Sequence, residues 1–263
     1  MTYAVLTIAG TDPTSGAGIA ADIKTLSALG GYALSCVTAV VAQNSRHVGE
    51  TVTMAAHVVS QQIDMAFQEM PVRSIKIGMI GSNSIAEKLT VLLPSFSKIP
   101  IVYDPVLKAS SGGRLHKENL SQDILEKLIK TVTLITPNLR ESAILLKRAE
   151  ARTVAEMKEQ AIMLHKLGVP WVLLKGGHLS DQEICTDVLV GPGEQCHFYS
   201  HDRVKTLHGR GTGCTLSSAL AFFMIDHPVP QAVSRARNYL IKTLKTADAL
   251  KLVPEHGPLN HYG

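Results

Sequence analysis

Short hydrophobic runs alternate with amphipathic, helix-like stretches along most of the chain. The short runs are rich in β-branched residues, a pattern typical of buried strands. The strand-like runs are 3–9, 33–41, 74–79, 100–103, 132–135 and 170–174. The helix-like stretches are 17–29, 53–68, 83–93, 118–129, 138–147 and 153–167. This alternation predicts an α/β fold with a mainly parallel central sheet and helices on both faces.

The pattern changes after Lys175. Two strand-like runs at 185–190 and 195–200 flank Gly191-Pro192-Gly193, which predicts a β-hairpin at an edge of the sheet. Helix-like stretches at 213–226 and 229–250 follow. Because no internal repeat, low-complexity linker or change of composition divides the sequence, we expect a single domain over residues 1–263.

Composition narrows the classes of partner. Lysine and arginine total 26 against 22 acidic residues, and they are spread along the chain without the dense basic tract that tracks a nucleic acid. No apolar stretch approaches the roughly 20 residues needed to cross a bilayer. The four cysteines lie far apart in the sequence, which argues against a zinc site or a disulfide framework. We therefore expect a cytoplasmic protein that binds small molecules rather than nucleic acid or membrane.

Ligands of open α/β sheets bind beyond the carboxyl ends of the strands, so residues directly after each strand are candidates for chemistry. A glycine-rich segment, 10–18, follows the first strand and leads into a helix that carries Asp22. Gln43 and Asn44 follow the second strand. A carboxylate and an amide suit the polar edge of a planar heterocycle. The same residues also suit a plain turn and a solvated or capping position, so both interpretations stay open.

Two carboxylates follow later strands. Asp104 ends the run at 100–103, and Glu141 lies one turn into the helix after 132–135. Carboxylates from neighbouring strand ends suit a magnesium ion that water and phosphate oxygens also bind. Asn138 and Glu141 have the spacing of a capping box, so a purely structural role is the alternative for Glu141.

The segment Gly211-Thr212-Gly213-Cys214 opens an apolar helix, and such a helix start presents unpaired amides and a positive dipole end to a transferring phosphoryl group. We expect the helix start to lower the pKa of Cys214, which would let the thiol act as a base. An inert thiol at a glycine-rich helix entry is the alternative. Lys175, at another strand end, suits contact with phosphate oxygens. The glycine pattern is not that of a P-loop.

In this order, these segments closely resemble the hydroxymethylpyrimidine and phosphomethylpyrimidine kinases of thiamin biosynthesis. The segments that carry the resemblance are Ile8-Ala9-Gly10-Thr11-Asp12-Pro13, Gly16-Ala17-Gly18 through Asp22, Ala42-Gln43-Asn44, Lys76-Ile77-Gly78-Met79, Asp104-Pro105-Val106, Thr136-Pro137-Asn138 with Glu141, Lys175-Gly176-Gly177-His178 and Gly211-Thr212-Gly213-Cys214. The chain departs from the family pattern at three places. Arg210 stands where the family usually has histidine, Ser45-Arg46 replaces the usual threonine and small residue, and Leu107-Lys108 replaces the usual methionine and small residue.

The resemblance implies a ribokinase-like fold and two successive ATP-dependent phosphorylations, of the hydroxymethylpyrimidine and then of its monophosphate. It implies that Asp22 and Gln43 bind the polar edge of the pyrimidine, and that Asp104 and Glu141 lie near magnesium. It further implies that Lys175 lies near the ATP phosphates, with Cys214 as the base. The residues implied around the ring are Gly10, Asp22, Gln43, Met79 and Val106, and those around the transferring group are Gly211, Thr212 and Gly213. A homodimer is the family default.

Two other functions remain open on the sequence. A pyridoxal or pyridoxine kinase would bind a ring of similar size. A catalytically silent pyrimidine-binding regulator is a different class, and the joint presence of Asp104, Glu141, Lys175 and Cys214 argues against it.

Overall fold

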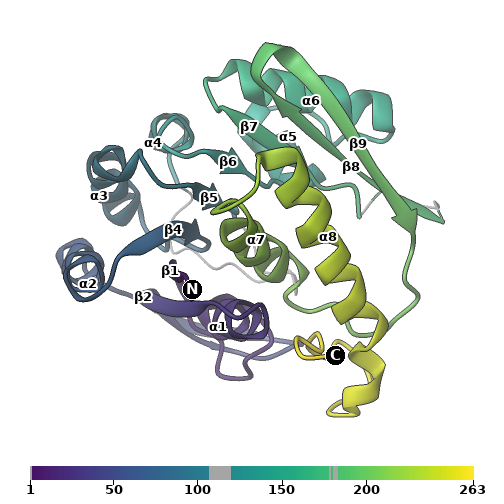
Figure 1. Cartoon of the computed structure of the whole chain (residues 1–263), viewed down its shortest axis with the longest axis horizontal. Helices are drawn as coiled ribbons and strands as arrows, with labels where there is room; N and C mark the ends of the chain where they lie inside the picture. Colours follow the sequence, from purple (N-terminus) through teal and green to yellow (C-terminus); the bar gives the residue numbers. More distant parts are fainter. Residues whose placement is uncertain (1, 107–119, 178, 180–182) are drawn as a thin grey trace.

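The computed structural model describes residues 2–106, 120–177, 179 and 183–263. Within them, nine strands form one sheet in the order β3-β2-β1-β4-β5-β6-β7-β8-β9 (Figure 1). The strands are β1 Ala4–Gly10, β2 Tyr32–Gln43, β3 Val48–Thr53, β4 Val72–Ile77, β5 Ile101–Tyr103, β6 Leu134–Ile135, β7 Trp171–Leu174, β8 Ile184–Gly191 and β9 Gln195–Asp202.

The centre of the sheet is parallel and both edges are antiparallel. Strands β2, β1, β4, β5, β6 and β7 pair in parallel, whereas β8 pairs antiparallel with β7 and β9 antiparallel with β8. The predicted hairpin is therefore confirmed, with a short 3-10 turn at Pro192–Glu194 between its strands.

Strand β3 was not predicted. It pairs antiparallel with β2, with Val52 opposite Val40. Its sequence, Val-Gly-Glu-Thr-Val-Thr, lacks a hydrophobic run, and most of its side chains are exposed or half-buried. The pairing edge of β2, rather than local hydrophobicity, holds it in the sheet.

Helices cover both faces of the sheet, as predicted. The helices are α1 Gly18–Ala28, α2 Ala56–Glu69, α3 Asn83–Leu92, α4 Gln122–Ile129, α5 Leu139–Leu146, α6 Val154–Lys166, α7 Thr212–Phe223 and α8 Val229–Lys245. The predicted helix at 118–129 thus begins at Gln122, and residues 118 and 119 lie outside the described ranges. Helix α8 stops at Lys245 rather than 250, where a 3-10 turn at Ala247–Leu250 follows.

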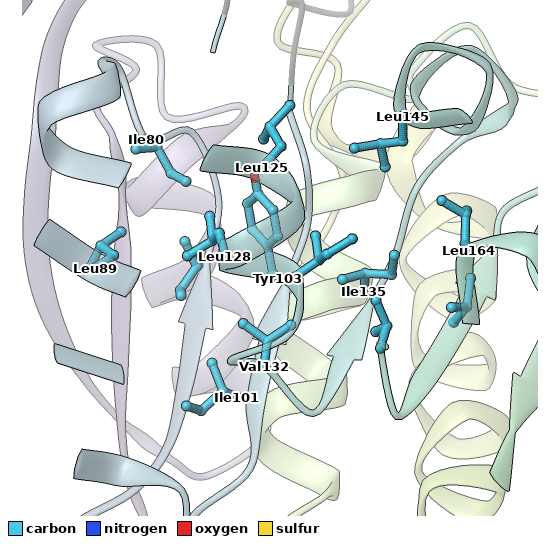
Figure 2. Close-up of a cluster of buried hydrophobic side chains, with 14 of the residues drawn as sticks. Ile80, Leu89, Ile101, Tyr103, Leu125, Leu128, Val132, Ile135, Leu145 and Leu164 are labelled. Atoms are coloured by element: carbon cyan, nitrogen blue, oxygen red, sulfur yellow. The ribbon is translucent and has the colours of Figure 1, made fainter. Parts of the chain in front are cut away.

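Alternate residues along the strands face the two helix layers. In β5, Ile101 and Tyr103 join a buried cluster with helices α2 to α6, whereas Val102 joins one with α1, α7 and α8. Figure 2 shows side chains from α3, α4, α5 and α6 converging on the strands of the first cluster. The labelled residues are Ile80, Leu89, Ile101, Tyr103, Leu125, Leu128, Val132, Ile135, Leu145 and Leu164.

The strand order contains one switch point, between β1 and β4. The chain leaves β1 through α1, on one face, and reaches β4 through α2, on the other. Beyond the carboxyl ends of such a strand pair lies the usual ligand crevice of open α/β sheets. Helix α7 packs on β1, β4 and β5, so the helix that starts at Thr212 covers the middle of the sheet. In the described part of the chain, none of the helices has the length and apolar character needed to span a membrane.

Candidate active site

Gly10 and Met79 meet at the switch point. Gly10 ends β1, and Met79 follows β4 by two residues. A Cβ atom on Gly10 would lie 2.9 Å from the Met79 sulfur, so any side chain there would displace the methionine. Met79 belongs to a small apolar cluster with Ala39 and Val41, against which Val106 packs.

One amide adjoins this apolar wall. The Nε2 atom of Gln43 donates to the carbonyl of Thr11, the residue after Gly10, at 3.0 Å. The structure therefore brings together four of the five residues implied around the ring, Gly10, Gln43, Met79 and Val106. An apolar surface with one polar group at its margin is suited to a small planar heterocycle. Their contact with a pyrimidine stays a prediction.

Asp22 is buried and bonded to other side chains rather than exposed to a ligand. Its side chain is fully buried and accepts hydrogen bonds at 2.8 Å from Lys76 Nζ, at both oxygens, and from Ser218 Oγ. Thr7 Oγ1 donates to it as well. A ring that bound Asp22 would have to open one of these bonds, so the predicted role of Asp22 requires a rearrangement.

The partner of Asp22 carried no predicted role. Lys76 lies inside β4 with its side chain completely buried. Burial alone would lower the pKa of the Lys76 ammonium, but Asp22, together with smaller effects from Cys214 and Asp104, outweighs burial and raises the pKa. A lysine within a strand-like run was the available signal, because a buried lysine requires a counter-charge.

A second charged pair lies at the ends of β5 and β7. Lys175 Nζ contacts Asp104 Oδ1 at 2.7 Å, and Thr136 Oγ1 donates to the same oxygen at 3.0 Å. Asp104 is 2% exposed. Burial alone would lower the pKa of Lys175, but Asp104, with a smaller effect from Glu141, raises it, so the lysine is charged at neutral pH.

Glu141 lies close enough to interact with this pair. It forms the predicted capping box, since its Oε2 atom accepts from the Asn138 amide at 2.8 Å while Asn138 Oδ1 accepts from the Glu141 amide at 2.9 Å. Burial and the Asp104 carboxylate raise the pKa of Glu141 to about 7, although Lys175 and the Asn138 amide lower it.

Asp104 and Glu141 fit a magnesium ion only in part. Both offer the hard oxygen atoms that this ion prefers. In the described ranges, however, no three His, Cys, Asp or Glu side chains are arranged to hold a metal. The donor set therefore suits an ion whose other ligands are water and phosphate, as the sequence suggested.

Helix α7 starts against the Asp104–Lys175 pair. A Cβ atom on Gly213 would lie 3.0 Å from Asp104 Oδ2 and 3.5 Å from Lys175 Nζ, so glycine permits this close approach. Gly211 is the N-cap residue, with a φ of 88° that favours glycine. The amides of a first helical turn have no partner within the helix, and Gly211 has no side chain to cap them. Thr212 opens the helix, so the four residues Gly211 to Cys214 lie at the helix start, as expected. Their binding of an anion stays a prediction.

The expected pKa of Cys214 was wrong in direction. Burial, with smaller contributions from Asp22 and Asp104, raises the pKa of this thiol to about 11 against the lowering effects of Lys76 and the Gly18 amide. The helix start was expected to lower the pKa, but loss of hydration and two nearby carboxylates act in the opposite direction. In the absence of ligands the thiol is protonated at neutral pH.

His178 of the Lys175 segment lies outside the described ranges.

Solved structures share this architecture over nearly the whole chain. Pyridoxal kinase from Bacillus subtilis, solved as an ADP complex, has a TM-score of 0.87 and 27% identity, covering 99% of this chain and 98% of its own. Phosphomethylpyrimidine kinase from Clostridium difficile has a TM-score of 0.79 and 33% identity, covering 93% and 100%. Fold and site together define a ribokinase-like kinase.

Sequence relatives specify the family. The hydroxymethylpyrimidine/phosphomethylpyrimidine kinase of Rhizobium meliloti is 39% identical over 263 residues, which cover 100% of this chain and 98% of the relative. The enzyme of the same name from Escherichia coli is 40% identical over 258 residues, or 98% and 96% of the two chains. A family model described as phosphomethylpyrimidine kinase matches residues 12–260. The chain belongs to the phosphomethylpyrimidine kinase family, which confirms the resemblance seen in the sequence.

Proposed function

We propose that the protein uses ATP to phosphorylate 4-amino-5-hydroxymethyl-2-methylpyrimidine, and then phosphorylates the resulting monophosphate to the diphosphate, in thiamin biosynthesis. Family membership across the chain supports this activity. The observation that carries it is the position of the α7 start. Gly213 adjoins the Asp104–Lys175 pair, while Cys214, next to it, interacts with the buried Asp22–Lys76 pair. The two halves of a phosphoryl-transfer site thus meet at one helix start.

The acceptor ring would lie against Gly10, Met79 and Val106, with its polar edge toward Gln43. This surface is apolar apart from the amide. The faces of the ring would gain apolar contacts, and its polar edge would exchange water for the amide. The geometry at Asp22 favours a supporting role, in which its carboxylate holds Lys76 and the wall in place.

The transferring group would lie at the first turn of α7. The P–O bond to the ATP β-phosphate breaks as a bond forms from phosphorus to the acceptor oxygen, and the developing charge faces the amides of Gly211 to Gly213. Lys175 would contact phosphate oxygens. Asp104 and Glu141 would hold magnesium, which, when bound, neutralises charge on the phosphate oxygens.

Cys214 would remove the proton of the hydroxymethyl group. The thiolate form of Cys214 takes this proton as the alcohol oxygen attacks phosphorus, so the sulfur must be held beside the acceptor. The second acceptor is a monophosphate, whose attacking oxygen is already anionic. The same helix start then serves both steps, and the thiol serves chiefly the first.

The neighbouring pyridoxal kinase structures keep that ring as the second candidate substrate. A silent regulator would not need the Asp104–Lys175 pair beside an uncapped helix start. We further propose a homodimer, which is the default of the family. We also propose a cytoplasmic location, because the sequence has no Cys-x-x-Cys pair or disulfide framework. Light scattering on the purified protein would test the dimer, and cell fractionation would test the compartment.

The decisive experiment is a side-by-side assay of the purified protein with magnesium and ATP. Hydroxymethylpyrimidine should give monophosphate and then diphosphate, and pyridoxal should react more slowly. Accumulation of monophosphate alone, with ATP in excess, would contradict the two-step activity. Faster turnover of pyridoxal would transfer the assignment to the vitamin B6 ring, and no turnover of any acceptor would favour the regulator.

A further inference from the structure

Arg210 joins two loops of the site. It directly precedes Gly211, and its guanidinium reaches the loop after β1. There NH2 contacts Asp12 Oδ2 at 3.0 Å, and NH1 donates to Thr14 Oγ1 at 2.9 Å. The side chain of Arg210 is only 11% exposed and that of Asp12 is fully buried. Such an enclosed ion pair constrains both loops more than a solvated one does.

Asp12 holds together the loop after β1 that Arg210 contacts. Its Oδ1 atom accepts from the amide and the hydroxyl of Thr14, at 3.0 and 2.9 Å. Its Oδ2 atom accepts from the amides of Gly16 and Ala17, at 3.0 and 2.8 Å. One carboxylate therefore fixes the whole turn from residue 12 to residue 17.

The two loops also touch directly. A Cβ atom on Gly211 would lie 2.1 Å from the Gly16 carbonyl oxygen, so the backbones are in close contact. A Cβ atom on Gly16 would lie 3.1 Å from Arg210 Cδ, so the stem of the arginine packs over the turn. The helix start that would bind phosphate thus rests on the turn that Asp12 fixes.

The other end of this turn adjoins the ring wall. Thr11 precedes Asp12, and its carbonyl accepts from Gln43 Nε2 at 3.0 Å, while its hydroxyl accepts from the Val41 amide at 3.0 Å. A continuous series of contacts therefore runs from Gln43 through Thr11, Asp12 and Arg210 to Gly211. A ring that binds at Gln43 orders the first member of the series, and the last member forms the anion site.

We propose that Arg210 is a positioning residue that couples the two substrate sites, so that pyrimidine and nucleotide each bind more tightly when the other is present. The inference rests on the proposed function. A ligand that fixes one loop removes part of the ordering cost that the second ligand would otherwise meet, which gives positive coupling. Coupling of this kind is reciprocal between the two ligands.

The test measures the dissociation constant of a non-hydrolysable ATP analogue, with magnesium, in the presence and absence of saturating hydroxymethylpyrimidine. We expect the pyrimidine to lower the constant by about five- to tenfold in the unaltered protein. Arg210→Ala should bring this ratio close to one, and Arg210→Lys should retain part of it. Lys166→Ala is the matched control, because the Lys166–Glu194 ion pair is 61% and 49% exposed. It should leave the ratio unchanged.

If Arg210 is merely structural, Arg210→Ala would weaken the binding of both ligands but leave the ratio of the two dissociation constants unchanged. That result would overturn the inference. So would a ratio of one in the unaltered protein that nevertheless binds both ligands. Failure of the unaltered protein to bind the pyrimidine at all would overturn the proposed function together with the inference. If Arg210→Ala does not fold, Asp12→Asn serves instead, since it removes the charge partner while keeping an oxygen for the turn amides. Its ratio should also approach one, and an unchanged ratio would count against the coupling.

Discussion

Cys214 lies at a helix start, where a lowered thiol pKa was expected, but the loss of hydration around its sulfur acts in the opposite direction. Its thiol has a pKa of about 11 because burial and two carboxylates outweigh Lys76. The proposed base is therefore protonated in the free protein, and only its small thiolate fraction can accept the proton of the attacking alcohol. This property separates the two phosphorylations, since only the first acceptor has a proton to lose from its attacking oxygen.

Cys214→Ser should slow the first phosphorylation by about 10²-fold or more and the second much less, because a positioned base is typically worth about 10² to 10⁴ in rate. Single-turnover rates on the two acceptors measure this directly. The raised pKa gives the pH dependence its sign. Below a pKa of about 11 the thiolate fraction grows with pH, so the cysteine-dependent rate should increase from pH 7 to 9, whereas the serine variant lacks this increase. Equal slowing of both steps would rule out the base.

Asp22 and Lys76 should behave as one unit. Both side chains are completely buried, so Asp22→Asn or Lys76→Met alone leaves the other group without its ionic partner, at a cost of about 3 to 5 kcal/mol of stability. The double variant should recover part of that loss. Denaturant unfolding measures the three variants against the unaltered protein. If Asp22→Asn instead kept its stability and lost pyrimidine affinity, the carboxylate would be a ring ligand after all.

At the scale of elements, the C-terminal segment supports the start of α7. The His256 amide donates to the Leu207 carbonyl at 2.8 Å, and the Arg210 amide donates to the Gly257 carbonyl at 3.2 Å. Further along, the Thr215 hydroxyl and His261 Nε2 are 3.1 Å apart. Burial lowers the pKa of His261 to about 4, so the ring is neutral at working pH and has one nitrogen able to accept a hydrogen bond.

His261→Phe should therefore leave the buried Thr215 hydroxyl without its hydrogen-bond partner, at a cost of about 1 to 3 kcal/mol. Because α7 serves both steps, the two phosphorylations should slow by the same factor, unlike the effect at Cys214. Thermal unfolding and both rates give the comparison. Tyr262→Ala is the neighbouring control, since Tyr262 is 69% exposed. A selective loss of one step would contradict this supporting role.

The sequence predicted elements well where hydrophobic periodicity was strong. The parallel strands, the hairpin and the helix faces follow from local pattern, and the order of strand ends was enough to collect Asp104, Lys175 and Gly213 at one edge. Strand β3 was not predicted because its residues pair with β2 without a hydrophobic run of their own. The burial of Asp22 and of Cys214 was not predicted for a related reason. Desolvation and counter-charges depend on which elements pack together, which no local pattern encodes.

At the scale of the whole molecule, the cover over the centre of the sheet comes late in the chain. Helix α7, Thr212–Phe223, packs on β1, β4 and β5, and shares a buried cluster with Val5, Val102 and Leu134. A ribosome has therefore made most of the protein before one apolar face of the central strands can be buried. That apolar face stays exposed during synthesis and can aggregate. We therefore expect chains interrupted before residue 212 to be bound by chaperones or degraded rather than to accumulate as a folded fragment.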